Sequence, residues 1–253
     1  MAPMKSIPAL FLFLLFFSIS QPTLAADDVF SHIWGGFSTS LQLRSDQQRH
    51  NTATAARDLD RLIIAPGETF SFNKRVGARD PGKGYQAAPI ITATGLLQDI
   101  PGGGICQLAS TIYNAGLLAG MQVVERHPHS RTVAHVPPGR DATIASWRKD
   151  LKLKNTHPYP LQLRIALNQN RLTTSLYGTV EKPFSAEIIV SRTRLVPDTV
   201  VVTATAHAPQ QQGASGFSTE TRRIIRENGQ VRDELISQDI YPAPSRVVAG
   251  SRP

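Results

Sequence analysis

The spacing of apolar residues predicts two helices in the first half of the chain. Between Gln47 and Ile63, apolar residues recur at steps of three and four, the period of a helix with one buried face. The second helix is expected to begin at Cys106, because the apolar residues that follow it share one helical face. Gly120 is suited to cap the end of this helix.

Alternating apolar and polar residues predict strands, most of them after Gly139. Asn228-Gly229 is typical of a tight hairpin turn between two of them. The pattern is mixed in Val29–Leu43, polar in 210–216 and rich in proline after Tyr241, so no strand is predicted there. The expected strands are Thr69–Asn73, Ala87–Thr94, one beginning at Val123, Asp141–Trp147, Leu151–Lys154, Leu161–Leu167, Leu172–Val180, Glu187–Val196, Thr199–Thr205, Thr221–Arg226 and Val231–Ser237.

These elements predict an α+β fold. We expect a mainly antiparallel sheet with a central helix that starts at Cys106, followed by a β-rich C-terminal tail. Residues 26–180 would form the main domain, and residues 181–253 the C-terminal extension.

Residues 1–25 have the pattern of a signal peptide that is cleaved before Ala26. Lys5 precedes an apolar run of 13 residues, Ile7–Ile19, and Thr23-Leu24-Ala25 offers small residues at the cleavage positions. A membrane anchor is the alternative, but a spanning helix needs about 20 apolar residues. We therefore expect an exported protein of the periplasm or extracellular envelope that is at most peripheral to the membrane.

The chain is basic, with 27 Lys and Arg against 19 Asp and Glu and a net charge of +8. Outside the cytoplasm, nucleic acid is not the expected partner of such a charge, and anionic envelope polymers are. The chain has one cysteine, Cys106, so it cannot form an internal disulfide.

Cys106 is the candidate nucleophile, because it follows the glycine-rich turn Gly102-Gly103-Gly104 and begins a helix. The N–H groups and dipole of a helix N-terminus stabilise a thiolate. The N–H groups of Gly103 and Gly104, with those of the helix, are suited to hold an oxyanion. The other interpretation is a buried structural cysteine that fills space.

A cysteine nucleophile needs a histidine base and a group that orients the base. If the strand that begins at Val123 continues, His127 and His129 point to the same side of it, and His135 is a further candidate. We favour His129, because Ser130 follows it and is able to set its tautomer. Asp141 is the candidate orienting group.

A zinc site formed by Cys106, His127 and His129 is the alternative, but the spacing matches no zinc signature and a structural site needs four ligands, so we predict no metal and no cofactor.

Several sequence blocks, taken in order, resemble the VanW domain from about Arg49 to about Ile165. The block that contains the cysteine is Gly103-Gly104-Ile105-Cys106-Gln107. The others are Pro66-Gly67-Glu68-Thr69-Phe70-Ser71-Phe72, Gly84-Tyr85, Ser110-Thr111-Ile112-Tyr113-Asn114-Ala115, Glu125-Arg126-His127-Pro128-His129-Ser130, Pro138-Gly139-Arg140-Asp141-Ala142-Thr143 and Asp150-Leu151-Lys152-Leu153-Lys154-Asn155. The C-terminal part resembles the β-tail that often follows that domain and, faintly, a G5-type module.

The family takes its name from vancomycin-resistance gene clusters, and some members are described as L,D-transpeptidases that make 3-3 peptidoglycan cross-links with the cysteine. The resemblance implies this role for Cys106, with a histidine of the 127–129 segment as base and peptidoglycan stem peptides as substrate. Gly103, Gly104, Gln107, Arg126 and Ser130 would contact the substrate, with Arg126 on stem carboxylates. A non-catalytic protein that binds peptidoglycan or a glycopeptide is the alternative function.

Overall fold

The computed structural model describes residues 29–91, 97–145, 148–196, 199–203, 211–212, 215–242 and 246–250. The predicted signal peptide and its cleavage site lie outside these residues and stay predictions. Within the part of the chain that the structure describes, no helix is long and apolar enough to cross a membrane.

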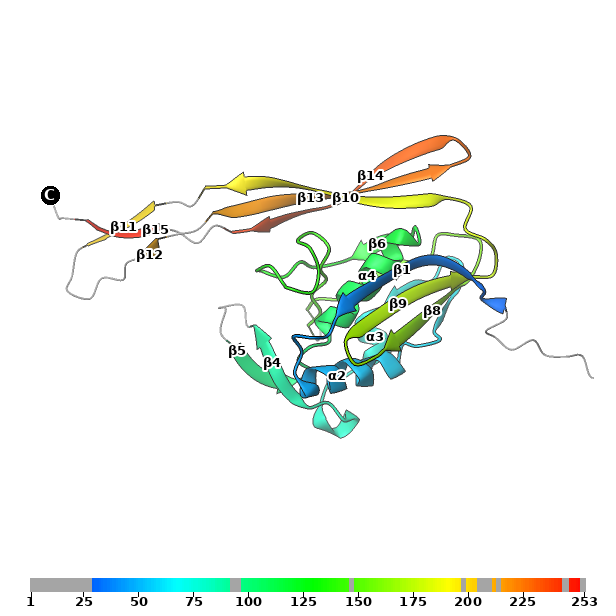
Figure 1. Ribbon diagram of the computed structural model, residues 1–253, viewed down its shortest axis with the longest axis horizontal. Coiled ribbons are helices and arrows are strands. Elements are labelled where there is room, and N and C mark those ends of the chain that lie inside the picture. Colours follow the sequence, from blue (N-terminus) through cyan, green and yellow to red (C-terminus); the bar gives the residue numbers. More distant parts are fainter. Residues whose placement is uncertain are drawn as a thin grey trace, which may run out of the picture.

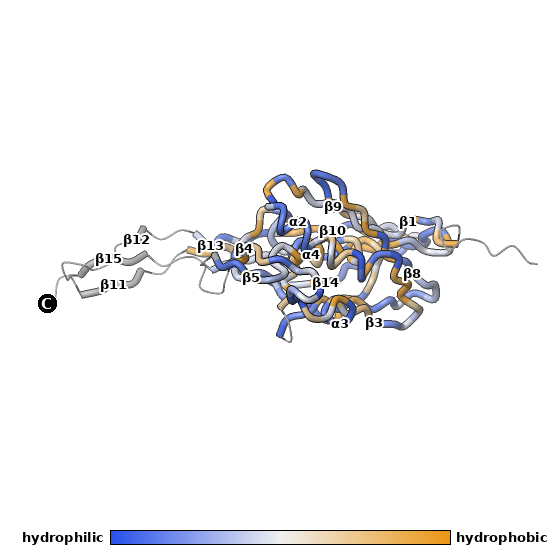
Figure 2. Tube along the Cα trace, turned by 90° about the horizontal axis from the view of Figure 1, so that it is seen from below, coloured by the Kyte–Doolittle hydropathy of each residue, from blue (hydrophilic) through white to orange (hydrophobic). Residues whose placement is uncertain are grey.

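The centre of the fold is helix α4 (Cys106–Leu118), which begins at the residue predicted from the sequence. Every residue from Gln107 to Leu117 is buried, so this helix has no solvent-facing side. One face of α4 packs against β1 (His32–Ser40) and β9 (Arg171–Gly178), and β10 (Ser185–Leu195) also contacts the helix. Figure 1 shows α4 enclosed by the strands of the body, and Figure 2 shows apolar positions gathered in this region.

Among the described residues, three small sheets build the rest of the body. An antiparallel sheet has the strand order β1-β9-β8-β2 and includes β8 (Leu161–Leu167) and β2 (Ile63–Ile64). A second antiparallel sheet has the order β3-β7-β6, and β4 pairs with β5 in a third. The strands of these two sheets are β3 (Thr69–Ser71), β7 (Lys152–Lys154), β6 (Gln122–Glu125), β4 (Ala87–Ile91) and β5 (Leu97–Pro101).

A long antiparallel sheet, which we call the C-terminal ribbon, lies across the body (Figure 1). It consists of β10, β13 (Gly216–Glu227) and β14 (Gln230–Tyr241), in the order β10-β13-β14. The predicted turn at Asn228-Gly229 joins β13 to β14, and Asn228 has a positive φ of 50°. Beyond the ribbon, β11 (Thr199–Thr203), β15 (Arg246–Gly250) and β12 (Gln211–Gln212) form a further sheet.

The structure confirms the predicted fold class, α+β with mainly antiparallel sheets, and corrects several elements. The first helix is α2 (Asp46–Arg57), capped by Ser45, and it ends before the predicted limit. Residues 141–145 form no strand beyond an isolated bridge from Ala145 to Lys149. The predicted strand at 69–73 ends in helix α3 (Phe72–Val76), and a 3-10 turn covers Pro81–Lys83. Strands β1, β2, β5, β12 and β15 occupy segments where none was predicted.

Strand β1 was missed because two glycines, Gly35 and Gly36, interrupt its alternation. Gly35 faces α4 so closely that a Cβ there would lie 2.3 Å from the backbone oxygen of Ala115 and 2.5 Å from the backbone nitrogen of Ala119. At Gly36 the nearest atom to such a Cβ is Ser175 Oγ, at 3.3 Å. The first glycine therefore permits the contact between the helix and the sheet.

We expect Gly35→Ala to destabilise the protein by about 3 kcal/mol, because helix backbone cannot yield to the added methyl group as a side chain can. Gly36→Ala is the matched control, and its cost should be below about 1 kcal/mol. Denaturant unfolding of the two variants measures both values. Equal stability of the two would contradict the packing described for α4.

Candidate active site

Cys106 lies at the N-terminus of α4, directly after the glycine-rich turn. The residue before it, Ile105, makes no side-chain capping hydrogen bond, so the first N–H groups of the helix keep their positive end uncovered by a capping side chain. The thiol is half-buried and its Sγ donates to the backbone oxygen of Ile144 at 3.6 Å. The structure thus places the cysteine where a helix dipole stabilises a thiolate.

An extended segment, residues 140–144, runs along one face of α4 and is held by side chains four residues apart. Asn114 donates to the backbone oxygen of Arg140 at 2.7 Å. Ser110 Oγ accepts from the backbone N–H of Ala142 at 2.9 Å, and Cys106 reaches Ile144. Four residues of helix rise about 6.0 Å and two residues of extended chain about 6.6 Å. Every second residue of the segment therefore lies opposite every fourth residue of α4. This match fixes the position of Asp141 relative to Cys106.

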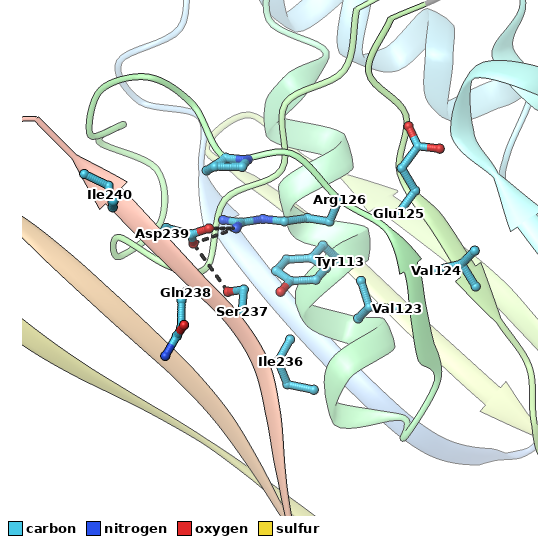
Figure 3. Close-up of a pocket in the computed structure, with 11 residues that line it drawn as sticks. Tyr113, Val123, Val124, Glu125, Arg126, Ile236, Ser237, Gln238, Asp239 and Ile240 are labelled. Carbon is cyan, nitrogen blue, oxygen red and sulfur yellow. Dashed lines mark hydrogen bonds and ion pairs between the residues drawn. The ribbon is translucent and has the colours of Figure 1, made fainter.

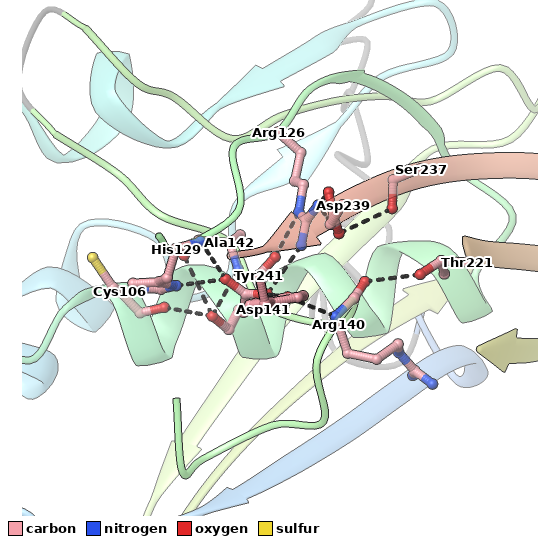
Figure 4. Close-up of polar contacts among 12 residues, drawn as sticks. Cys106, Arg126, His129, Arg140, Asp141, Ala142, Thr221, Ser237, Asp239 and Tyr241 are labelled. Atoms are coloured by element: carbon pink, nitrogen blue, oxygen red, sulfur yellow. Dashed lines mark hydrogen bonds and ion pairs between the residues drawn. The ribbon is translucent and has the colours of Figure 1, made fainter. Parts of the chain in front are cut away.

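Asp141 holds His129 by two hydrogen bonds to one carboxylate oxygen (Figure 4). Oδ2 accepts from the backbone N–H of His129 and lies 2.6 Å from its ring Nδ1. Because a buried carboxylate accepts hydrogen bonds, Nδ1 carries a proton and Nε2 is left to interact with Cys106. His129 and Cys106 each favour the charged form of the other, which lowers the pKa of the thiol and raises that of the ring. The three predicted catalytic residues therefore come together in space.

The charges at this site favour an imidazolium between two anions. Burial works against a charged His129, but the hydrogen bonds to Asp141 and Cys106 outweigh it and raise the pKa of the ring to about 9. Burial also works against a charged Asp141, yet His129 and Arg126 lower the pKa of this carboxyl to about 2. Asp141 is thus ionised at neutral pH and favours the protonated form of His129.

The pKa of the Cys106 thiol lies below its usual value. Burial raises it, but the hydrogen bond and positive charge of His129, together with the charge of Arg79, lower it by more. We expect alkylation of the wild-type protein to show a midpoint below about pH 8.5, the value of a free thiol. A rate profile with a small alkylating reagent across pH 5–10 measures it. A midpoint at or above 8.5 would contradict the thiolate–imidazolium pair.

Two of the predicted residues turn away from Cys106. The ring of His127 lies 3.0 Å from Glu125 Oε1, so the alternative zinc ligands Cys106, His127 and His129 do not converge. Ser130 is exposed, and within the described part of the chain no hydrogen bond joins it to His129. Asp141, and not Ser130, sets the tautomer of His129.

Arg126 and Gln107 were predicted to bind substrate, but their polar atoms are used inside the protein. The guanidinium of Arg126 is 3% exposed and donates to Asp141 and Asp239. Gln107 is 1% exposed; its amide donates to Thr39 and to the backbone of Ser40, and its oxygen accepts from Arg44. In this arrangement the polar atoms of both side chains support the site from within, and their contact with substrate stays a prediction.

The glycine-rich turn is shaped by close packing. A Cβ at Gly103 would lie 2.3 Å from the backbone oxygen of Ala88, and Gly104 has a φ of +103°. The N–H of Gly103 donates to Ile100 at 3.2 Å, so it is not available to an oxyanion as predicted. The N–H groups of Gly104 and Cys106 have no hydrogen-bond partner within the described residues, and they remain the candidate oxyanion donors.

The structure adds cationic side chains that the sequence did not single out. Arg44 contacts Gln107 and the ring of His135, and its charge interacts with the Cys106 thiol, as does that of Arg79. Burial, followed by the charges of Arg44 and His129, lowers the pKa of His135 to about 3. A ring with so low a pKa is a weak base, so His129 is the stronger candidate for the base that serves Cys106.

The model of the VanW-like protein family matches residues 47–177 of the chain. The uncharacterized protein YoaR of Bacillus subtilis is 39% identical over 163 residues, which are 64% of this chain and 51% of YoaR. The vancomycin B-type resistance protein VanW of Enterococcus faecalis is 30% identical over 135 residues, which are 51% of this chain and 48% of that protein.

The chain thus spans about half the length of the curated relatives it matches. No solved structure matches it. The family match covers more than half of the chain. It includes the helix that begins at Cys106, and it includes His129 and Asp141. The chain belongs to the VanW-like protein family.

Proposed function

We propose that the protein is a cysteine acyltransferase of the cell envelope that acts on peptidoglycan stem peptides in the manner of an L,D-transpeptidase. The observation that carries this proposal is the buried Asp141 carboxylate, which holds Nδ1 of His129 at 2.6 Å while the other side of the ring interacts with Cys106. Nucleophile, base and orienting group in this relation are the arrangement that acyl transfer by cysteine requires.

The reaction starts from the thiolate of Cys106 and the imidazolium of His129. The thiolate attacks the carbonyl carbon of the third stem residue, and the N–H groups of Gly104 and Cys106 hold the oxyanion. The bond to the terminal D-Ala breaks, and the leaving amine takes the proton of His129. An amine of a neighbouring stem then gives a proton to His129 and attacks the thioester, which forms the cross-link and releases the thiolate. Water in place of the amine would give a carboxypeptidase.

Two further observations support a substrate of the envelope. The basic chain, with a net charge of +8, suits an anionic wall polymer. One relative carries the name of a vancomycin B-type resistance protein, and the N-terminal pattern predicts export.

The test is incubation of the protein with tetrapeptide stem fragments, followed by mass spectrometry of the intact chain. We expect an adduct on Cys106 whose mass is that of the fragment minus its terminal D-Ala, and none in Cys106→Ala. Binding of the fragments with no adduct and no release of D-Ala would overturn the proposal and favour the non-catalytic binding protein.

A further inference from the structure

The last residues of the C-terminal ribbon reach the candidate active site. Tyr241, at the end of β14, donates its hydroxyl to Asp141 Oδ1 at 2.9 Å and accepts from the backbone N–H of Gly139 at 2.9 Å. The hydroxyl thus contacts the carboxylate oxygen that does not face His129 (Figure 4). Rotation of the carboxylate would break this bond together with the bond to His129.

Asp239, two residues earlier, pairs with the arginine that supports Asp141. Nη1 of Arg126 lies 2.5 and 2.6 Å from the two oxygens of Asp239, while Nη2 donates to Asp141 Oδ1 at 3.1 Å. Nε of the same guanidinium donates to the backbone oxygen of Asp141 at 2.6 Å. The side chains are 3% and 4% exposed, so water does not screen this pair.

The ribbon is not joined to the body by strand pairing at this point. Strands β6 and β14 belong to different sheets, and a pocket of about 560 Å³ lies between them. Figure 3 shows Arg126 extending from the β6 side of the pocket to Asp239 on β14. Cys106, His129 and Asp141 are not among the residues that line the pocket. Polar side chains therefore connect ribbon and site in the described part of the chain, and Thr221 on β13, which donates to the backbone oxygen of Gly139, joins Asp239 and Tyr241 in this.

We infer that Asp239 and Tyr241 are positioning residues of the Cys106–His129–Asp141 site. Asp239 neutralises Arg126, which leaves the negative charge of Asp141 to act on His129, and Tyr241 fixes the rotation of the Asp141 carboxylate. Both residues lie outside the 47–177 segment that matches the family, so the C-terminal ribbon completes a site whose reacting groups lie within it. This inference rests on the proposed function.

The test is the pH profile of Cys106 alkylation, which reads one site because the chain has one cysteine. In Asp239→Asn, the positive charge of Arg126 is balanced by Asp141 alone, so Asp141 stabilises the imidazolium of His129 less. The pH midpoint of Cys106 alkylation should therefore rise by about one unit. In Tyr241→Phe, which keeps the ring stacked on Phe217, the midpoint should rise by a smaller amount.

Glu234→Gln is the matched control. Glu234 is also a β14 carboxylate paired with a buried arginine, Arg223, but that arginine donates to the backbone oxygens of Leu117 and Met121 near the other end of α4. The control should lower the melting temperature and leave the midpoint unchanged.

The outcomes separate this inference from the proposed function. A wild-type midpoint at or above about 8.5 would overturn the thiolate–imidazolium pair itself. A lowered wild-type midpoint that stays in place in both Asp239→Asn and Tyr241→Phe would overturn only the role of the ribbon. If the alkylation midpoint shifts as much in Glu234→Gln as in Asp239→Asn, the effect is one of general stability, and the role of the ribbon is overturned as well.

Discussion

Cys106→Ala is expected to abolish acyl transfer and leave the fold intact. The substitution removes one sulfur atom at a half-buried helix N-terminus, where the thiol makes a weak hydrogen bond of 3.6 Å to Ile144 and interacts with His129. The cavity should cost on the order of 1 kcal/mol. For a chain of this size that cost lowers the melting temperature by about 2–4 °C. Product formation from stem fragments, measured beside a thermal melt, tests both parts.

The melt separates a nucleophile from a structural cysteine. A variant that keeps its activity would exclude the thioester mechanism. A variant that melts more than about 10 °C below the wild type would show that the cysteine mainly fills space, and its lost activity would then carry no mechanistic information. Ala109→Gly, at a fully buried alanine in the next turn of α4, is a useful comparison, because it weakens the same helix by about 1 kcal/mol without touching the thiol.

The local part of the site could be predicted from the sequence. The start of α4 at Cys106 follows from a glycine-rich turn and an apolar helical face, both of which depend on neighbouring residues alone. Hairpin β13–β14 follows in the same way from Asn228-Gly229. The spacing of His127 and His129 could not choose between them, because the choice depends on Asp141, and α4 places Asp141 through Ser110 and Asn114.

The long-range part of the site left no local signal. The polar segment around Arg126 suggests an exposed cationic side chain. Its burial depends on Asp239, which lies 113 residues later in the chain. Tyr241 directly precedes a proline-rich segment in which no strand was predicted. Asp239 and Tyr241 are brought near Asp141 by the packing of the ribbon on the body. The spacing of apolar residues along the chain does not predict this packing.

His129→Ala is expected to lower activity by roughly 10²–10⁴-fold, the usual loss when a general base is removed. The alkylation midpoint of Cys106 should rise toward about 8.5, because the group whose hydrogen bond and charge lower the thiol pKa is gone. His127→Ala is the control, since its ring pairs with Glu125 and is 36% exposed. It should change neither activity nor midpoint by much. Stem-fragment turnover and the pH profile are measured on both variants.

A midpoint that moves only in His127→Ala would reverse the assignment, and one that moves in neither would leave the α4 N-terminus and the nearby arginines as the whole source of thiol activation.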